Sequence, residues 1–83
     1  MRIKVRLKKY REETVGIDTE FIRLDALLKF AAVVQTGGEA KMLISDGIVS
    51  VDGEICTQRG KKVYPGQKVT LDDLRITVTK AEK

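Results

Sequence analysis

The chain has 83 residues, 42% of them hydrophobic, with two Phe, two Tyr and no Trp; this length suits a single domain, residues 1–83, and excludes a second core. Lys and Arg exceed Asp and Glu by 16 to 12, and the net charge of +4 favours polyanionic partners, although plain soluble proteins often carry such a charge. No apolar run reaches the roughly 18 residues of a membrane span, and the N-terminal residues alternate instead of forming a signal-peptide block, so we expect a cytoplasmic protein without a membrane partner.

The first 20 residues predict a basic strand and a connection. Basic and apolar residues alternate over residues 2–8, the period of two that gives a strand one basic and one apolar face. Arg2, Lys4 and Arg6 could extend a surface for a polyanion, or they could keep an edge strand from pairing with other chains. Residues 9–20 are polar and contain a glycine, so they are expected to connect this strand to a core over residues 21–79.

A first helix is expected over about residues 24–33. Apolar residues from Leu24 to Ala32 recur at the spacing of one helical face. Asp25 and Lys29 are four residues apart, which would let them pair on the opposite side of the helix. The pattern therefore predicts a short amphipathic helix that must be held by packing.

A second helix is expected to begin at Gly37. Thr36 and Glu39 match a capping box, in which each side chain satisfies a backbone N–H at the start of a helix. Gly47 is well placed to end the helix, because glycine enters the left-handed conformation without a steric penalty. The helix would then have only two to three turns and would depend on the first helix and a sheet for its stability.

The rest of the chain predicts short strands joined by tight turns. Asp52-Gly53 is a hairpin-type turn signal, and Pro65-Gly66 marks a second turn. The strands are expected at residues 48–51, 54–56, 67–71 and 75–79. The sequence thus predicts an α+β protein with two packed short helices on a small twisted antiparallel sheet and an extra basic strand at the N-terminus.

The residues needed for catalysis are missing. The chain has no histidine, no nucleophile beside a base and no phosphate-loop motif. Cys56 has no second cysteine for a disulfide and no histidine to act as its base, so we expect it to pack in a strand. Carboxylates alone offer no ligand loop of recognisable spacing. We therefore expect no enzyme, no cofactor, no metal and no small-molecule substrate.

A string of spaced residues runs through the predicted helices and strands. It comprises Arg23-Leu24-Asp25, Ala40, Leu43-Ile44, Gly47, Val49, Val51, Asp52-Gly53 and Pro65-Gly66-Gln67-Lys68-Val69. This string resembles the S-four-type RNA-binding domain, named after small-subunit ribosomal protein four, and within it the stand-alone ribosome-maturation type. The likeness covers about residues 21–78. It implies an αL-type fold whose helix pair and adjoining loop grip structured RNA, and a role in ribosome assembly or maturation.

The resemblance implies RNA-binding residues on both helices and on the loop after Cys56. They are Arg23 and Lys29 on the first helix, Thr36, Gly37, Gly38 and Lys41 on the second, and Arg59, Lys61 and Lys62 in the loop. Many relatives begin the second helix with serine-arginine, where this chain has Thr36-Gly37. A phosphate would therefore have to meet backbone N–H groups at this position.

Elementary chemistry supports the same site. A helix N-terminus presents unsatisfied N–H groups and a partial positive charge, and Gly37-Gly38 has no side chain to hold a phosphate at a distance. Lys41 lies about one turn further on, and the loop cations can adapt to an irregular RNA backbone. Taken without the resemblance, the same residues could be a tight turn between helices and a solvated lysine face.

The few aromatic residues favour recognition of RNA by shape and phosphate over base stacking. Phe21 and Phe30 are expected to be buried or half-buried, and Tyr64 is expected to pack under the basic residues that follow Cys56, with base stacking as its alternative role. The expected partner is ribosomal RNA or a ribosomal subunit precursor.

A second function stays open at this point. The chain could be a protein-interaction module that pairs by strand addition, or a homodimer formed through its N-terminal strand, with RNA binding incidental. A steep dependence on salt would be expected only of RNA binding.

Overall fold

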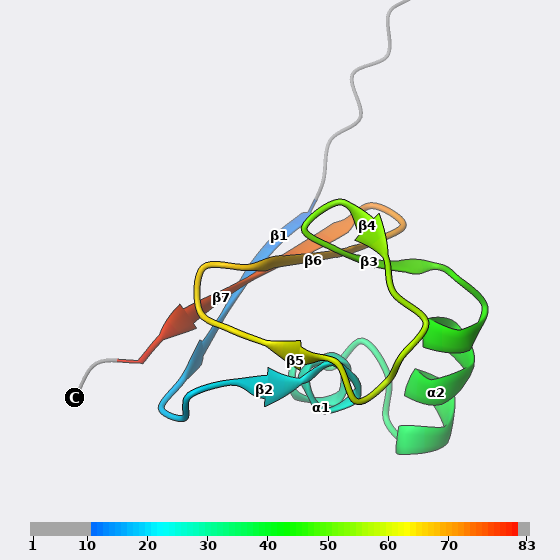
Figure 1. Ribbon diagram of the computed structural model, residues 1–83, viewed down its shortest axis with the longest axis horizontal. Helices are drawn as coiled ribbons and strands as arrows, with labels where there is room; N and C mark the ends of the chain where they lie inside the picture. The colour runs from blue at the N-terminus through cyan, green and yellow to red at the C-terminus, as the bar shows by residue number, and fades with distance from the viewer. Residues whose placement is uncertain (1–10, 82–83) are drawn as a thin grey trace, which may run out of the picture.

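The computed structural model describes residues 11–81, which form two helices and seven strands (Figure 1). In chain order these are β1 (Arg11–Ile17), β2 (Ile22–Arg23), α1 (Leu24–Phe30), α2 (Gly37–Ser45), β3 (Val49–Val51), β4 (Glu54–Ile55), β5 (Lys62–Val63), β6 (Lys68–Leu71) and β7 (Leu74–Lys80). The N-terminal strand expected at residues 2–8 lies outside the described residues. No helix among the described residues is long and apolar enough to cross a membrane.

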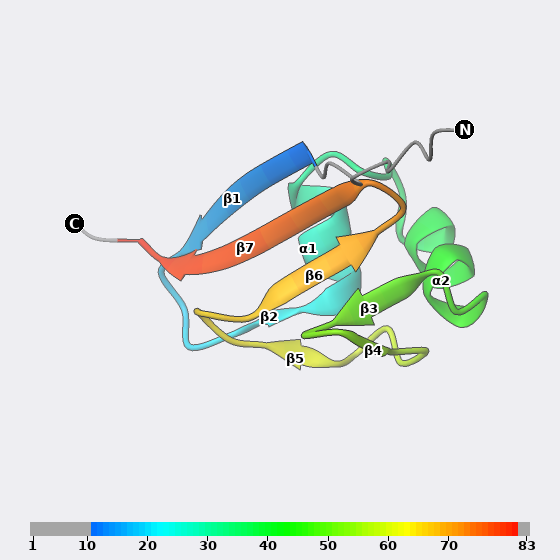
Figure 2. The same ribbon diagram turned by 90° about the horizontal axis from the view of Figure 1, so that it is seen from above.

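Five strands form one sheet in the order β1-β7-β6-β3-β4, and β2 pairs with β5 in a separate antiparallel ribbon. Figures 1 and 2 together show α1 under one face of the five-stranded sheet and α2 beside it, near the start of β3. The core lies between α1 and the sheet. Its fully buried side chains include Leu24, Leu27 and Leu28 of α1 and Val69, Ile76 and Val78 of the sheet. The predicted α+β class, with a helix pair on a small sheet, is confirmed.

The expectation that residues 9–20 form a connection was wrong for residues 11–17. This segment is β1, and it runs parallel to β7 with Val15 opposite Val78. Only Val15 and Ile17 of the strand are buried, so its polar first half shows no alternation that would indicate a strand. Backbone pairing with β7 holds that half instead, because ladder hydrogen bonds do not depend on side-chain type. The sheet is therefore mixed and not antiparallel throughout.

Helix α1 ends at Phe30, earlier than the expected end near residue 33. Ala32 adopts a left-handed backbone conformation with φ +62°, which stops the helix although the apolar spacing continues. The Ala32 N–H donates to the carbonyl of Lys29 at 3.0 Å, and the Val33 N–H donates to that of Leu28 at 2.9 Å. These bonds satisfy carbonyl groups that the end of a helix would otherwise leave without partners.

Helix α2 begins and ends as predicted. The Thr36 Oγ1 accepts a hydrogen bond from the Glu39 N–H at 3.2 Å. The Glu39 carboxylate accepts from the Gln35 N–H at 2.8 Å, so the second bond of the capping box closes one residue earlier than in the usual pattern. Gly47 follows the helix with φ +77°. That left-handed conformation is the reason a glycine suits this position.

The predicted turns and strands after Gly47 are present, with one pairing that the sequence did not indicate. Asp52 and Gly53 both have positive φ, as a two-residue hairpin between β3 and β4 requires. The unforeseen pairing joins β2 to β5, with Ile22 opposite Val63. Two residues are too few to show a periodic pattern, so only the folded chain reveals this ribbon.

Phe30 and Tyr64 differ from expectation, whereas Phe21 does not. Phe30 is 65% exposed, so its expected burial was wrong; it is the last residue of α1 and lies outside the core. Phe21 is half-buried, as expected, and its ring lies 5.7 Å from that of Tyr64. Tyr64 is 42% exposed, so it is not buried beneath the loop of residues 57–61 as expected.

Candidate nucleic-acid interface

The loop of residues 57–61, which we call the basic loop, is attached to the start of α1 by backbone hydrogen bonds. The Leu24 N–H donates to the carbonyl of Lys61 at 2.8 Å, and the Asp25 N–H donates to that of Arg59 at 3.1 Å. Helix α1 has no side-chain cap, so these carbonyls take the place of one. The cations of the loop are thereby held beside those of the helix.

A shallow groove of about 360 Å³ lies between this loop, α1 and the start of α2. Its lining residues are Arg23, Asp25, Ala26, Lys29, Gly37 and Arg59, and we call it the basic groove. Three cationic side chains face one carboxylate there, so an anion would be attracted to it. Four of the nine predicted site residues, Arg23, Lys29, Gly37 and Arg59, are brought together by the fold.

Arg23 has its orientation set from two sides. Its guanidinium pairs with the Asp25 carboxylate at 3.2 Å, whereas the expected pairing of Asp25 was with Lys29. That expectation was wrong, because Asp25 lies at the N-terminus of α1, next to Arg23. A Cβ added to Gly60 would lie 3.7 Å from the Arg23 guanidinium, so the backbone of the basic loop passes directly against this side chain. Lys29 has no ion pair within residues 11–81, so its exposed ammonium group is not neutralised by a carboxylate there.

The start of α2 contributes backbone groups. Thr36 uses its hydroxyl oxygen to cap the Glu39 N–H, while the N–H groups of Gly37 and Gly38 have no hydrogen-bond partner within residues 11–81. Apart from its chain neighbours and the backbone of α2, no atom lies within 4 Å of a Cβ position at Gly37. Lys41 is exposed further along α2 but does not line the groove. The helix start is therefore open to an anion at the edge of the basic groove.

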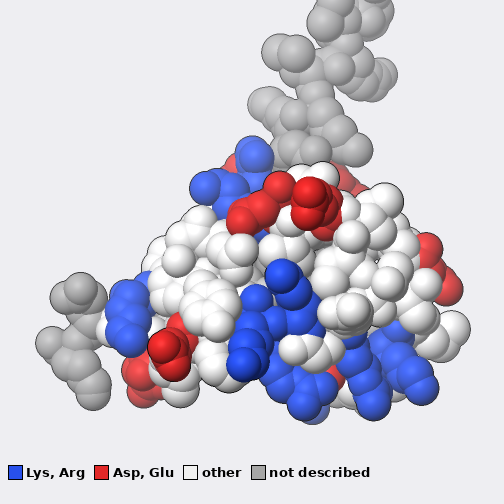
Figure 3. All heavy atoms as spheres, in the orientation of Figure 1, with Lys and Arg blue, Asp and Glu red and all other residues white. Residues whose placement is uncertain are grey.

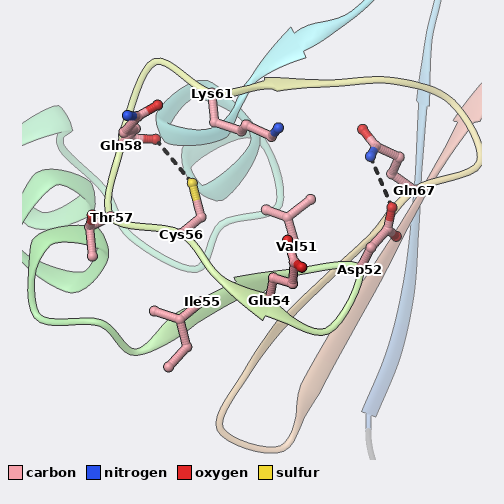
Figure 4. Close-up of a pocket in the computed structure, with 9 residues that line it drawn as sticks. All are labelled: Val51, Asp52, Glu54, Ile55, Cys56, Thr57, Gln58, Lys61 and Gln67. Carbon is pink, nitrogen blue, oxygen red and sulfur yellow. Dashed lines mark hydrogen bonds between the residues drawn. The ribbon is translucent and has the colours of Figure 1, made fainter.

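The other two predicted cations, Lys61 at the end of the basic loop and Lys62 at the start of β5, do not line the basic groove. The Lys62 ammonium lies 4.9 Å from the centre of the Phe21 ring, a cation–π contact. Lys61 lines a second hollow of about 330 Å³ between the β3–β4 hairpin and the basic loop (Figure 4). We call this the hairpin hollow; it is lined by Asp52, Glu54, Cys56, Gln58 and Lys61, together with Gln67 and three further residues. Cys56 is half-buried and packs against the core, but it lies just after β4, so its expected place within a strand was wrong.

Asp52 joins the hairpin to the strand that follows. Its carboxylate accepts hydrogen bonds from the Lys68 N–H at 3.0 Å and from the Gln67 side-chain amide at 2.9 Å. The Gln67 side-chain oxygen in turn accepts from the Tyr64 N–H at 2.8 Å. The bond from the Lys68 N–H, helped by Gln67 and the positive charges of Lys68 and Lys61, lowers the pKa of Asp52 against the opposing effect of burial. The carboxylate is therefore ionised at neutral pH.

Sequence reasoning missed Asp25 and Ala26 as residues of the basic groove, and Asp52 and Gln67 as residues of the hairpin hollow. Asp52 and Gln67 belong to turns whose sequence signals were visible, but a turn signal does not show which side chains meet across it. On the surface, Lys and Arg gather over α1, β5 and the start of α2, whereas a group of carboxylates lies near the β3–β4 hairpin (Figure 3). The basic face thus coincides with the helix pair.

The helix pair on a twisted sheet, with cations at the start of α1 and on the basic loop, is the arrangement expected of the resembled domain, and comparison with known families agrees. The chain belongs to the S4 domain family, whose model matches residues 15–79. It is 43% identical over 58 residues to a protein of Bacillus subtilis (strain 168) named "Probable ribosome maturation protein RlbA", a match that spans 70% of this chain and 82% of that protein.

A solved structure is also similar over nearly the whole chain. It is the solution structure of YbcJ from E. coli, described as revealing an ALFAL motif involved in RNA-binding. The two superpose with a TM-score of 0.59 and 26% sequence identity over 95% of this chain and 99% of that one. The family and the α+β fold predicted from the sequence are both confirmed.

Proposed function

We propose that this protein binds structured RNA of the ribosome or of a ribosomal precursor, and that it acts in ribosome maturation in the cytoplasm without catalysing a reaction itself. The observation that carries the proposal is the basic groove, where Arg23, Lys29 and Arg59 meet beside the open start of α2. Membership of the S4 domain family and the likeness to a protein named for ribosome maturation support it.

The geometry favours a grip on the RNA backbone. Guanidinium groups form paired, directional hydrogen bonds to phosphate, and the ammonium group of Lys29 adds a mobile point charge. The attachment of the basic loop to α1 keeps Arg59 close to Arg23, so little ordering is needed when RNA binds. A surface of this kind selects RNA by the spacing of its phosphates, and so by its folded shape.

We propose a role for each of the nine predicted residues. Arg23, Lys29 and Arg59 contact phosphates in the basic groove, while Gly37 and Gly38 offer backbone N–H groups at its edge. Thr36 holds the start of α2 in place, and Lys41 extends the positive surface along the helix. Lys61 acts from the hairpin hollow, which its side chain lines, and Lys62 acts beside Phe21, where its ammonium group lies.

The experiment that tests this function is crosslinking in the cells that produce the protein. The tagged protein is crosslinked and washed at high salt, the recovered RNA is sequenced, and the co-purified proteins are identified. Enrichment of one segment of ribosomal RNA is the expected result, and it would also name the subunit. A discrete protein complex without RNA would contradict the proposal and favour a protein-interaction module that works by strand addition or as a homodimer.

A further inference from the structure

We propose that the hairpin hollow binds one unpaired guanine base of the RNA whose phosphates lie in the basic groove. This inference rests on the proposed function and adds a site for base recognition to it. The proposal is based on the contrast between the two hollows beside the basic loop. The basic groove is lined by three cations and one carboxylate, whereas the hairpin hollow is lined by two carboxylates and a single lysine.

The charge of the hairpin hollow argues against a phosphate. Asp52 and Glu54 lie on its hairpin side and Lys61 on its loop side. An RNA phosphate brought beside two carboxylates would be repelled, whereas a nucleobase carries no net charge and presents donors and acceptors at its edge. A volume of about 330 Å³ lies at the lower end of the roughly 300–1,000 Å³ typical of small-ligand sites, which suits a single nucleoside.

The polar groups of the hollow suit guanine in particular. A carboxylate has about four acceptor positions, and the two bonds from Lys68 and Gln67 leave some of those on Asp52 free. Guanine presents adjacent N–H and NH₂ donors and a carbonyl oxygen on one edge, so a carboxylate can accept from the donors while an ammonium donates to the oxygen. Figure 4 shows the Lys61 side chain extending across the hollow toward Gln67 and Asp52. The other bases do not offer two adjacent donors.

Both hollows are reached by one strand of RNA because they share the basic loop. Arg59 lines the basic groove, and Lys61, two residues later, lines the hairpin hollow. Two residues span at most about 7 Å of backbone, so the two hollows are close together. A single RNA strand can therefore place a phosphate in the basic groove and the base of a neighbouring nucleotide in the hairpin hollow. Structured RNA offers such bases in its loops and bulges.

The test is a titration of the full ¹⁵N-labelled chain with GMP, AMP, CMP and UMP, followed by amide chemical shifts. All four nucleotides carry the same phosphate, so any response of the basic groove should be common to them. Only GMP is expected to shift the amide signals of Asp52, Gln58 and Lys61. Equal shifts with all four nucleotides, or none at these residues, would overturn the proposal. Shifts at these residues with free arginine but not with GMP would also overturn it, because the hollow would then suit a protein side chain.

A pair of matched variants tests the same site in RNA. Asp52→Asn keeps an acceptor for the Lys68 N–H and suits a left-handed position, and Asp72→Asn removes the same charge from a second turn residue with φ +52° outside both hollows. Loss of a negative charge alone should strengthen RNA binding slightly. We expect Asp52→Asn instead to weaken binding of the crosslinked ribosomal RNA segment by about tenfold, with an unchanged salt slope. Equal behaviour of the two variants would refute base recognition.

The two proposals fail separately. If the unmodified chain binds the ribosomal RNA segment in a salt-dependent way but GMP produces no selective shifts, the hollow proposal falls and the RNA-binding function stands. If the chain binds no ribosomal RNA, both fall. The nucleotide titration uses the unmodified chain, so it decides the question even if Asp52→Asn does not fold.

Discussion

The backbone N–H of Asp25 donates a hydrogen bond to the carbonyl oxygen of Arg59 at 3.1 Å, and so joins the first turn of α1 to the basic loop. The bond uses only main-chain atoms of Arg59, which leaves its guanidinium free to line the basic groove beside Arg23. Arg59 thus attaches the loop with its backbone and, under the proposed function, would contact RNA with its side chain. Substitution of the side chain can therefore test binding without removing the attachment.

Arg59→Ala and Lys29→Ala should each weaken RNA binding and lower its salt dependence. If each side chain meets one phosphate, the slope of log affinity against log salt should decrease in magnitude by roughly one unit per variant. We expect the same of Lys41→Ala if RNA extends along α2. Fluorescence anisotropy with the crosslinked RNA segment at several salt concentrations measures the slope. Lys80→Ala is the matched control, because Lys80 is exposed at the end of β7 and lines neither hollow. An unchanged slope for Arg59→Ala would contradict a phosphate contact in the groove.

Substitution of Gly38 tests whether the glycine pair at the start of α2 contributes to RNA binding or only to the turn before the helix. A Cβ at this position would meet nothing closer than the Thr36 hydroxyl at 3.9 Å, so the fold has space for a side chain. Gly38→Ala should stabilise the protein by roughly 0.5–1 kcal/mol, because alanine restricts the unfolded chain and favours the helix. Gly38→Val should weaken RNA binding more than it destabilises the fold, when the loss of affinity and the fall in melting temperature are both expressed as free energies. Parallel loss of affinity and stability would instead mean that the glycine pair serves only the turn.

Asp52 should make stability depend on pH in the acid range. Its pKa is lowered in the folded protein by the hydrogen bond from Lys68, so the stability that it contributes is present above the unfolded-state pKa of about 3.9 and is lost as pH falls through the lower folded-state value. Urea unfolding of the unmodified chain and of Asp52→Asn between neutral pH and about pH 3 checks this. The difference in stability between them should shrink below about pH 4. A constant difference across that range would show that Asp52 acts only through its turn geometry.

Ala32 carries a conformational penalty that glycine would remove. Its φ of +62° is unfavourable for a residue with a Cβ, and glycine adopts it freely. Ala32→Gly should stabilise the protein by about 0.5–1 kcal/mol and raise the melting temperature by roughly 2–8 °C. Ala31→Gly is the matched control, because Ala31 has φ −84° and should lose stability instead. Destabilisation by both substitutions would mean that the added freedom of glycine in the unfolded chain outweighs the strain relieved at Ala32.

The sequence predicted those features whose physical cause lies within a few residues. The cap of Thr36 on Glu39, the left-handed Gly47 and the Asp52-Gly53 hairpin all depend on neighbouring atoms, and all three are confirmed. The apolar spacing of α1 also predicted its buried face, although it could not show that Ala32 would leave the helix. Local chemistry was enough to identify the helix pair and, with the spaced residues of the S4 domain, the family.

The tertiary structure alone decided which distant segments meet. The first half of β1 is polar and becomes a strand only because β7 offers it a parallel ladder, and no local pattern records that partner. The two hollows arise in the same way. Arg23 and Arg59 meet in one because the basic loop bonds to the start of α1, and Asp52 and Gln67 meet in the other because β3 pairs with β6. The sequence by itself determined the elements and their charges, whereas the sites depend on contacts that form only when the chain closes on itself.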